Sequence, residues 1–182
     1  MEKRSAKKLE ELDVELRDLF ESLKDYSDNQ LNRKTSDGKW SILQNMHHLI
    51  QAEGTSQKYI EKKMSFNPEL QNSGFSNGVR GMLLGLYMKS GKKAKAPEFI
   101  NMESLPMDTK FWETVKLWKE QRQYLKTFLE GLDPELYKKQ LYKHPAAGKL
   151  TIYQMLNFFQ QHFKRHRKAI EKISKNLPKQ IN

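Results

Sequence analysis

Four stretches of this 182-residue chain repeat apolar residues at spacings of three and four, and this period constrains the fold more than any other feature. Such spacing places the apolar side chains on one face of an α-helix. The sequence therefore predicts an all-α four-helix bundle, because amphipathic helices of this length bury their apolar faces against one another. The stretches run from about Ser5 to Tyr26, from Trp40–Ser41 to Lys63, from Asp108 to Glu130, and from Leu150 or Thr151 to a point before Pro178.

The stretches begin and end at residues typical of helix boundaries. Ser41 suits an N-cap, and Gly131 followed by Asp133–Pro134 ends the third stretch. Residues 64–106 break the period with several Gly and Pro, although Val79–Met88 within them is predicted to form a short apolar helix. A connection this long is unusual in a compact domain. We therefore expect a single domain over residues 1–182, in which 64–106 is an inserted crossover that also forms a lid.

Composition narrows the classes of function. The chain has no cysteine, so disulfides and thiolate metal sites are excluded and any metal must bind N and O ligands. The charged N-terminus is unlike a signal peptide, and no apolar run approaches the ~20 residues that span a bilayer, so a cytoplasmic location is expected. The formal net charge of +11 favours anionic partners. Because Lys and Arg are spread along the whole chain, nucleic-acid binding is the least favoured function.

His162 and His166 lie one turn apart on the same side of the fourth predicted helix. At about 100° per residue, His166 falls inside the apolar stripe and His162 borders it. Each imidazole needs a partner, because burying an unpaired polar group costs roughly 1–3 kcal/mol. Such a pair can chelate one metal ion. The alternative is a pair of core histidines bonded to a carbonyl or carboxylate, and the pattern alone leaves both open.

A third ligand has to come from another helix, and His47 and His48 are the candidates. They lie roughly 10 Å from the start of the second helix, while His162 and His166 lie roughly 12–18 Å from the end of the fourth. If the two helices are antiparallel, these distances place the histidines of both helices at the same height in the bundle. Periodicity does not choose between the neighbours, because both point away from the apolar stripe, although His48 shares its face with small residues.

Glu53 and Arg122 fall on the apolar stripes of the second and third helices. Each lies about 12 or 13 residues from its helix start, so parallel helices would bring them to one level. A buried charge without a partner is strongly unfavourable. We therefore predict a buried Glu53–Arg122 ion pair beside the metal pocket. Both residues are also secondary candidates for catalysis, Glu53 as a general base and Arg122 as a site for an anionic substrate group.

The remaining histidines and aromatic residues are given structural roles. His47 is expected either to be exposed at the surface or to contact a metal ligand without binding the metal itself. His144, which precedes Pro145, is expected to shape the turn into the last helix or to reach the pocket mouth. Three aromatic residues are expected in the core rather than as substrate platforms: Trp112, Trp118 and Tyr153.

Two parts of the chain resemble signatures of the DinB/YfiT-like family. Trp40-Ser41-Ile42 followed by His47-His48-Leu49 resembles the second-helix signature, in which the metal histidine falls eight residues after the tryptophan. The segment from His144-Pro145 through Gly148, then Leu150-Thr151 and His162-Phe163-Lys164-Arg165-His166, resembles the last-helix signature with its His-x-x-x-His pair. The resemblance covers nearly the whole chain. Carried over residue by residue, it implies three ligands for one divalent ion: His48, His162 and His166.

The resemblance also implies an up-down-down-up bundle, in which the long connection joins parallel second and third helices, together with zinc or nickel as the metal and a homodimer. Family members include thiol transferases that couple low-molecular-weight thiols to electrophiles, maleylpyruvate isomerases and hydrolases. We therefore expect a metal-dependent enzyme acting on a small molecule. It is either a bacillithiol-type thiol transferase, with a low-molecular-weight thiol as cofactor, or a hydrolase. The alternatives are a non-catalytic helical binding protein and, less favoured, an electrostatic nucleic-acid binder.

Overall fold

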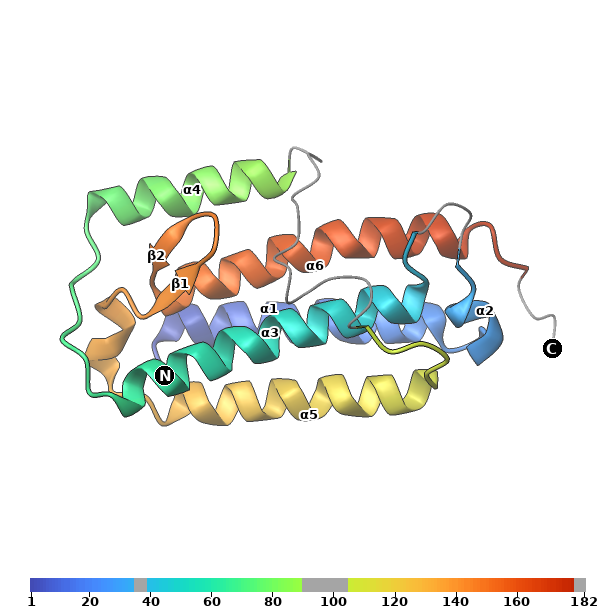
Figure 1. Cartoon of the computed structure of the whole chain (residues 1–182), viewed down its shortest axis with the longest axis horizontal. Helices are drawn as coiled ribbons and strands as arrows, with labels where there is room; N and C mark the ends of the chain where they lie inside the picture. The colour runs from blue at the N-terminus through green and yellow to red at the C-terminus, as the bar shows by residue number, and fades with distance from the viewer. Residues whose placement is uncertain (35–38, 90–104, 179–182) are drawn as a thin grey trace.

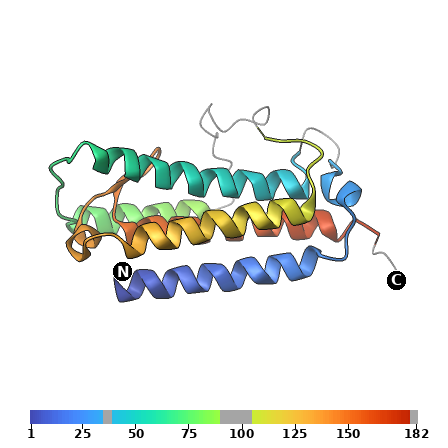
Figure 2. The same ribbon diagram turned by 90° about the horizontal axis from the view of Figure 1, so that it is seen from below.

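The computed structural model describes residues 1–34, 39–89 and 105–178. Four long helices lie side by side in Figures 1 and 2. They are α1 (Lys3–Leu23), α3 (Ile42–Ser65), α5 (Phe111–Glu130) and α6 (Ile152–Ser174). The predicted all-α four-helix bundle is confirmed, and the helix ends differ from the predicted ones by a few residues. None of the described helices is both long and apolar enough to cross a membrane.

The bundle has the predicted up-down-down-up topology. Helices α1 and α6 run in one direction and α3 and α5 in the other, as Figures 1 and 2 show. Helix α3 packs against both α5 and α6, and α1 packs against α6. Because α3 and α5 are parallel neighbours, the chain must return along the bundle between them.

The returning connection contains a further helix, α4 (Phe75–Lys89), which begins before the predicted short helix at Val79–Met88. Helix α4 lies outside the four-helix bundle and packs along α6 (Figure 1). Part of the predicted crossover and lid, residues 90–104, lies outside the described residues.

Two capping boxes fix the starts of the helices that carry the candidate ligands. Ser41 Oγ accepts a hydrogen bond from the backbone N–H of Gln44, whose side-chain oxygen accepts one from the backbone N–H of Ser41. Thr151 and Gln154 form the same reciprocal pair before α6. Each box satisfies donors that a helix start leaves unpaired. The predicted N-cap at Ser41 is confirmed.

Several short elements were not predicted, because segments of three to five residues carry too little periodicity. They are helix α2 (Asp28–Asn32), the 3₁₀ helix η3 (Pro134–Lys138), and the antiparallel strands β1 (Tyr142–His144) and β2 (Gly148–Leu150). Gly148 has φ of +74°, a conformation that favours glycine. Asp108, the predicted start of the third helix, has φ of +54° and cannot be helical, so α5 begins at Phe111.

Apolar side chains fill the space between the helices in two clusters. One gathers around Trp118 and Phe163, and the other around Leu12 and Phe159. Trp118 is 0% exposed, as predicted for a core residue. Trp112 is 61% exposed, so its predicted core position is wrong. Tyr153 is half-buried beneath the guanidinium of Arg4, which lies 4.6 Å from the ring centroid.

A buried ion pair joins the parallel helices α3 and α5. Glu53 and Arg122 each lie eleven residues after the first residue of their helix, and they are 2% and 4% exposed. Nε and Nη2 of Arg122 donate to the two oxygens of Glu53 at 2.5 and 2.7 Å. Nη1 donates to Oδ1 of Asp13 on α1 at 3.1 Å. The predicted Glu53–Arg122 pair is confirmed, and it connects three helices at one level.

Replacing Arg122 with Met should lower the free energy of unfolding by about 3–5 kcal/mol. The loss is expected because the Glu53 carboxylate would stay buried with the indole N–H of Trp118, 3.3 Å away, as its partner. Urea unfolding followed by circular dichroism measures this. The double variant Glu53→Met/Arg122→Met should recover most of the loss, since no buried charge remains unpaired and the Asp13 side chain, which is 38% exposed, stays in contact with water. A single variant as stable as the wild type, or a double variant no better than the single, would contradict the assignment.

Candidate metal centre

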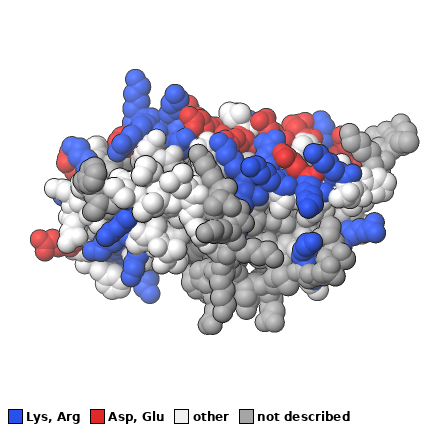
Figure 3. Space-filling model, turned by 90° about the horizontal axis from the view of Figure 1, so that it is seen from above, with Lys and Arg blue, Asp and Glu red and all other residues white. Residues whose placement is uncertain are grey.

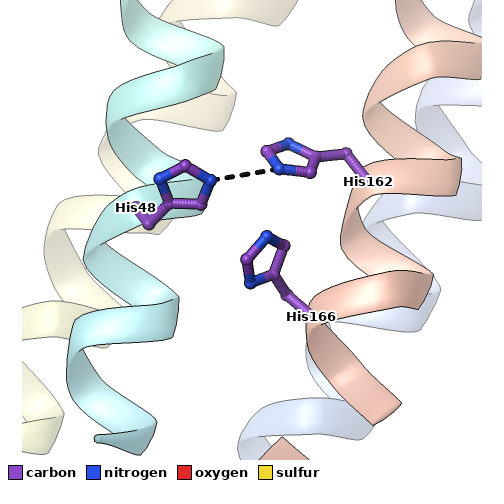
Figure 4. A group of neighbouring side chains, drawn as sticks. All are labelled: His48, His162 and His166. Atoms are coloured by element: carbon purple, nitrogen blue, oxygen red, sulfur yellow. Dashed lines mark hydrogen bonds between the residues drawn. The ribbon is translucent and has the colours of Figure 1, made fainter. Parts of the chain in front are cut away.

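Three histidine side chains from two antiparallel helices converge inside the bundle. His48 projects from α3, and His162 and His166 project from successive turns of α6 (Figure 4). Nε2 of His48 and Nε2 of His162 face each other at 3.1 Å. The ring centroids are 4.7 to 4.9 Å apart, and one ligand atom of each residue lies within 4.8 Å of the others. The structure thus brings together all three residues that the sequence analysis selected.

The spacing of these nitrogens suits one shared metal ion. Zinc–nitrogen bonds of about 2.0–2.1 Å at tetrahedral angles hold two ligand nitrogens roughly 3.3 Å apart. The 3.1 Å between Nε2 of His48 and Nε2 of His162 is close to this value, and the ligand atoms of all three histidines lie within 4.8 Å of one another. Three protein ligands leave a coordination position open, as in catalytic zinc sites. The residues present therefore fit a divalent metal.

All three imidazoles are held in the neutral form that a metal requires. Burial lowers the pKa of His48 to about 4. Burial, together with the nearby His48 and Arg165, lowers the pKa of His166 to about 3. Burial and then the other two histidines lower the pKa of His162 well below its ordinary value. At pH 7 each ring therefore offers a nitrogen lone pair.

Asn45 and Trp40 hold the histidine rings in place. Oδ1 of Asn45 lies 2.8 Å from Nδ1 of His166, while the Asn45 amide nitrogen donates to the carbonyl of Ser41 at 2.8 Å. Since the amide oxygen can only accept, His166 carries its proton on Nδ1 and its Nε2 is left for a metal. The Trp40 ring stacks on His166 at 5.8 Å and tilts over His48 at 4.6 Å. The sequence analysis missed Asn45, whose only signal is its place three residues before His48.

The other two histidines lie outside the cluster. Nε2 of His47 lies 3.3 Å from the hydroxyl of Thr109 and 3.1 Å from that of Thr114, so this ring faces the start of α5. Nδ1 of His144 accepts hydrogen bonds from the backbone N–H groups of Ala146 and Ala147 in the β1–β2 turn. His144 therefore shapes the turn before α6, which is one of the two roles predicted for it.

Glu53 and Arg122 face a different side of α3. Their charges are paired with each other toward α5 and α1, whereas His48 faces α6. A catalytic role for either residue stays a prediction, and the paired geometry favours a structural one.

The DinB superfamily is the class of protein to which the fold and the histidine cluster point. The sequence profile of this superfamily matches residues 11–170, and the chain belongs to it. The uncharacterised protein YuaE of Bacillus subtilis (strain 168) is 24% identical over 159 residues, which cover 87% of this chain and 91% of YuaE. The solved structure of YfiT from Bacillus subtilis, described as a probable metal-dependent hydrolase with an unusual four-helix bundle topology, is also similar. It has a TM-score of 0.59 and 17% identity, covering 96% of this chain and 89% of YfiT, which shows a shared fold. The predicted DinB/YfiT-like family is confirmed.

Replacing Asn45 with Ala should weaken zinc binding by about 10–100-fold, because His166 would lose the acceptor that orients its ring. Competition with a chromogenic chelator measures the affinity. Asn45→Asp keeps the oxygen acceptor and should retain the affinity. Asn176→Ala, the same truncation at an exposed residue just after the end of α6, serves as a control. Equal zinc affinities for Asn45→Ala and the wild type would show that Asn45 does not position the ligand.

Zinc binding should release close to no protons from the histidines at pH 6. Their lowered pKa values mean that the rings are already neutral there, and protons begin to compete only as the pH falls toward 4. Three histidines with an ordinary pKa of about 6.5 would release about two protons at pH 6. Calorimetric titration in buffers of different ionisation enthalpy counts the protons. A release of about two per zinc would show that burial does not keep these rings neutral.

Proposed function

We propose that this protein is a metal-dependent hydrolase of small molecules, with His48, His162 and His166 binding one divalent ion, zinc or nickel. The observation that carries the proposal is the convergence of three neutral imidazoles at one point between α3 and α6. The likeness to YfiT, described as a probable metal-dependent hydrolase, supports it.

The charge of such a site indicates which kind of group would occupy the open coordination position. Three neutral ligands leave both charges of a divalent ion uncompensated, and no carboxylate joins the histidines in the described part of the chain. A partly buried double positive charge favours an anion in the open position. A bound ion would lower the pKa of a coordinated water or thiol toward neutrality and would polarise a substrate carbonyl. Hydrolysis would add the hydroxyl of water to that carbonyl carbon, break the bond from this carbon to the leaving group, and give the remaining proton of the water to the leaving group.

The surrounding side chains prepare the histidines for this chemistry. Asn45 fixes which nitrogen of His166 carries the proton. The Trp40 indole covers His48 and His166 and keeps water from that side of the rings. Glu53 is not assigned as the general base, because both its oxygens accept hydrogen bonds from Arg122.

Thiol transfer is the second candidate, and it is favoured by the same uncompensated charge. A divalent zinc ion binds thiolate strongly, so a low-molecular-weight thiol such as bacillithiol would fill the open position as an anion. The thiolate sulfur would form a bond to an electrophilic carbon, and the leaving group would depart with the electron pair.

Metal analysis and two paired variants test the proposal. Protein prepared without a histidine tag and supplied with zinc should hold one ion per chain. His48→Ala and His166→Ala should each weaken zinc binding by about 100-fold, which corresponds to about 2.7 kcal/mol. His47→Ala removes the neighbouring ring, which faces Thr109 and Thr114, and should leave zinc binding unchanged.

Turnover then separates the candidate reactions. The zinc-loaded wild type should hydrolyse 4-nitrophenyl acetate, lose this activity when treated with 1,10-phenanthroline, and regain it when zinc is added back. Coupling of bacillithiol to 1-chloro-2,4-dinitrobenzene without ester hydrolysis would favour thiol transfer instead. A chain that stays metal-free in excess zinc and nickel would refute both reactions.

Two non-enzymatic alternatives have outcomes of their own. Zinc binding without turnover in either assay would indicate a helical binding protein. Nucleic-acid binding would require affinity that falls steeply with salt. Figure 3 shows Lys and Arg side chains next to Asp and Glu along one edge of the molecule, which is unlike a continuous basic stripe.

A further inference from the structure

A groove of about 570 Å³ separates α4 from the first half of α6. Three glycines of α4 face it, Gly78, Gly81 and Gly85, at helical spacings of three and four. A Cβ atom at Gly81 would lie 2.9 Å from the side-chain nitrogen of Gln154, so this side chain of α6 lies directly against the backbone of α4 there. A Cβ atom at Gly78 or Gly85 would meet nothing within 4 Å. The groove is therefore narrow beside Gly81 and open beside Gly78 and Gly85.

The side chains that line the groove suit an uncharged molecule with an apolar body. Met82 and Leu86 of α4 stand at its rim, 60% and 57% exposed, and the ring of Phe158 from α6 lines it. The α6 wall also carries the amides of Asn157 and Gln161, for which no hydrogen bond within the described residues is found. These amides can pair with a carbonyl or hydroxyl of a ligand.

Charged groups are scarce around the groove. Among the described residues that line the groove, Arg4 alone is charged, and its Nε already donates to Glu2 at 2.7 Å. Figure 3 looks onto the side of the molecule that carries α4, and the surface there is mostly uncharged. The groove volume lies within the range of about 300–1,000 Å³ that is usual for small-molecule sites.

The groove leads to the histidine cluster along one face of α6. Phe158 and Gln161 line the groove, and His162 follows Gln161 directly. The Phe158 ring stacks on the His162 ring, with centroids 5.3 Å apart and planes 15° from parallel. Phe158 is thus a wall shared by the groove and the cluster. Phe158 precedes His162 by four residues, which is about one helical turn of α6.

We propose that the α4–α6 groove binds the uncharged apolar body of the substrate, an acyl or aryl ester, with its cleavable carbonyl directed past Phe158 toward His162. This inference rests on the proposed function for the reaction, but the groove itself can be tested without turnover. The apolar rim, together with the two amides that have no hydrogen-bond partner among the described residues, argues for a small uncharged ester rather than an ionic substrate.

Binding of a neutral fluorescent probe, N-phenyl-1-naphthylamine, tests the groove directly. The wild type should bind it at one site. Gly85→Leu places a side chain into open space without a clash and should weaken probe binding at least about tenfold, the effect expected from losing roughly two buried methylene groups. Leu83→Ala is the control, because Leu83 is 55% exposed but does not line the groove. Zinc affinity should be the same in all three proteins.

Equal probe binding by Gly85→Leu and the wild type would overturn the proposal. So would absence of binding to the wild type, which would mean that another part of the chain or a second copy fills the groove. An equal loss in Leu83→Ala would overturn it too, because the probe would then lie on the outer surface of α4.

Esters of increasing chain length connect the groove to the reaction. For 4-nitrophenyl acetate, butyrate and hexanoate, kcat/KM of the zinc-loaded wild type should rise about fourfold per added methylene. Gly85→Leu should flatten this rise, whereas Leu83→Ala should keep it. Probe binding with the predicted variant pattern but no ester hydrolysis would support the groove and refute the hydrolase. If the rate of hydrolysis does not depend on chain length and the probe does not bind, the hydrolase would be supported and the groove proposal refuted.

Discussion

The buried pair of Glu53 and Arg122 is the interaction on which the arrangement of the bundle depends. Parallel neighbours such as α3 and α5 cannot be joined by a tight turn, so chain connectivity does not fix their relative height. Two parallel hydrogen bonds between a guanidinium and a carboxylate do fix it. Arg122 also donates to Asp13 of α1, and α1 packs on α6, so the pair connects the helix that carries His48 to a neighbour of the helix that carries the other two histidines.

The histidine cluster is unfavourable for the folded chain by itself. Its rings lose solvent, their pKa values fall, and the buried nitrogens His48 Nδ1 and Trp40 Nε1 lack hydrogen-bond partners in the described residues. A buried polar atom without a partner costs free energy that the rest of the structure must offset. Such costs concentrate at functional sites, where local stability is given up for chemistry. This reasoning favours a ligand-binding role for the cluster over a purely structural one.

Sequence reasoning succeeded where a polar residue interrupts an apolar stripe. Glu53, Arg122 and His166 were identified in this way, because each breaks a period that is otherwise regular. His48 could not be identified from the pattern. Helix α3 is covered by α5 on one side and by α6 on another, and no single apolar stripe describes a helix that is buried on two sides. Only the family resemblance selected it over His47.

Other features carried no usable signal in one sequence. Trp112 looks like a core residue by type, but it lies on the outer face of α5. Asn45 becomes informative only once the ring it orients is known. The position of α4 has a wider consequence, because the proposed metal ligands stand on α3 and α6 whereas one wall of the groove belongs to the connection between α3 and α5. If the groove selects the substrate as proposed, reactivity and selectivity are encoded in separate stretches of the gene, and relatives with the same three histidines would accept different compounds wherever that connection differs.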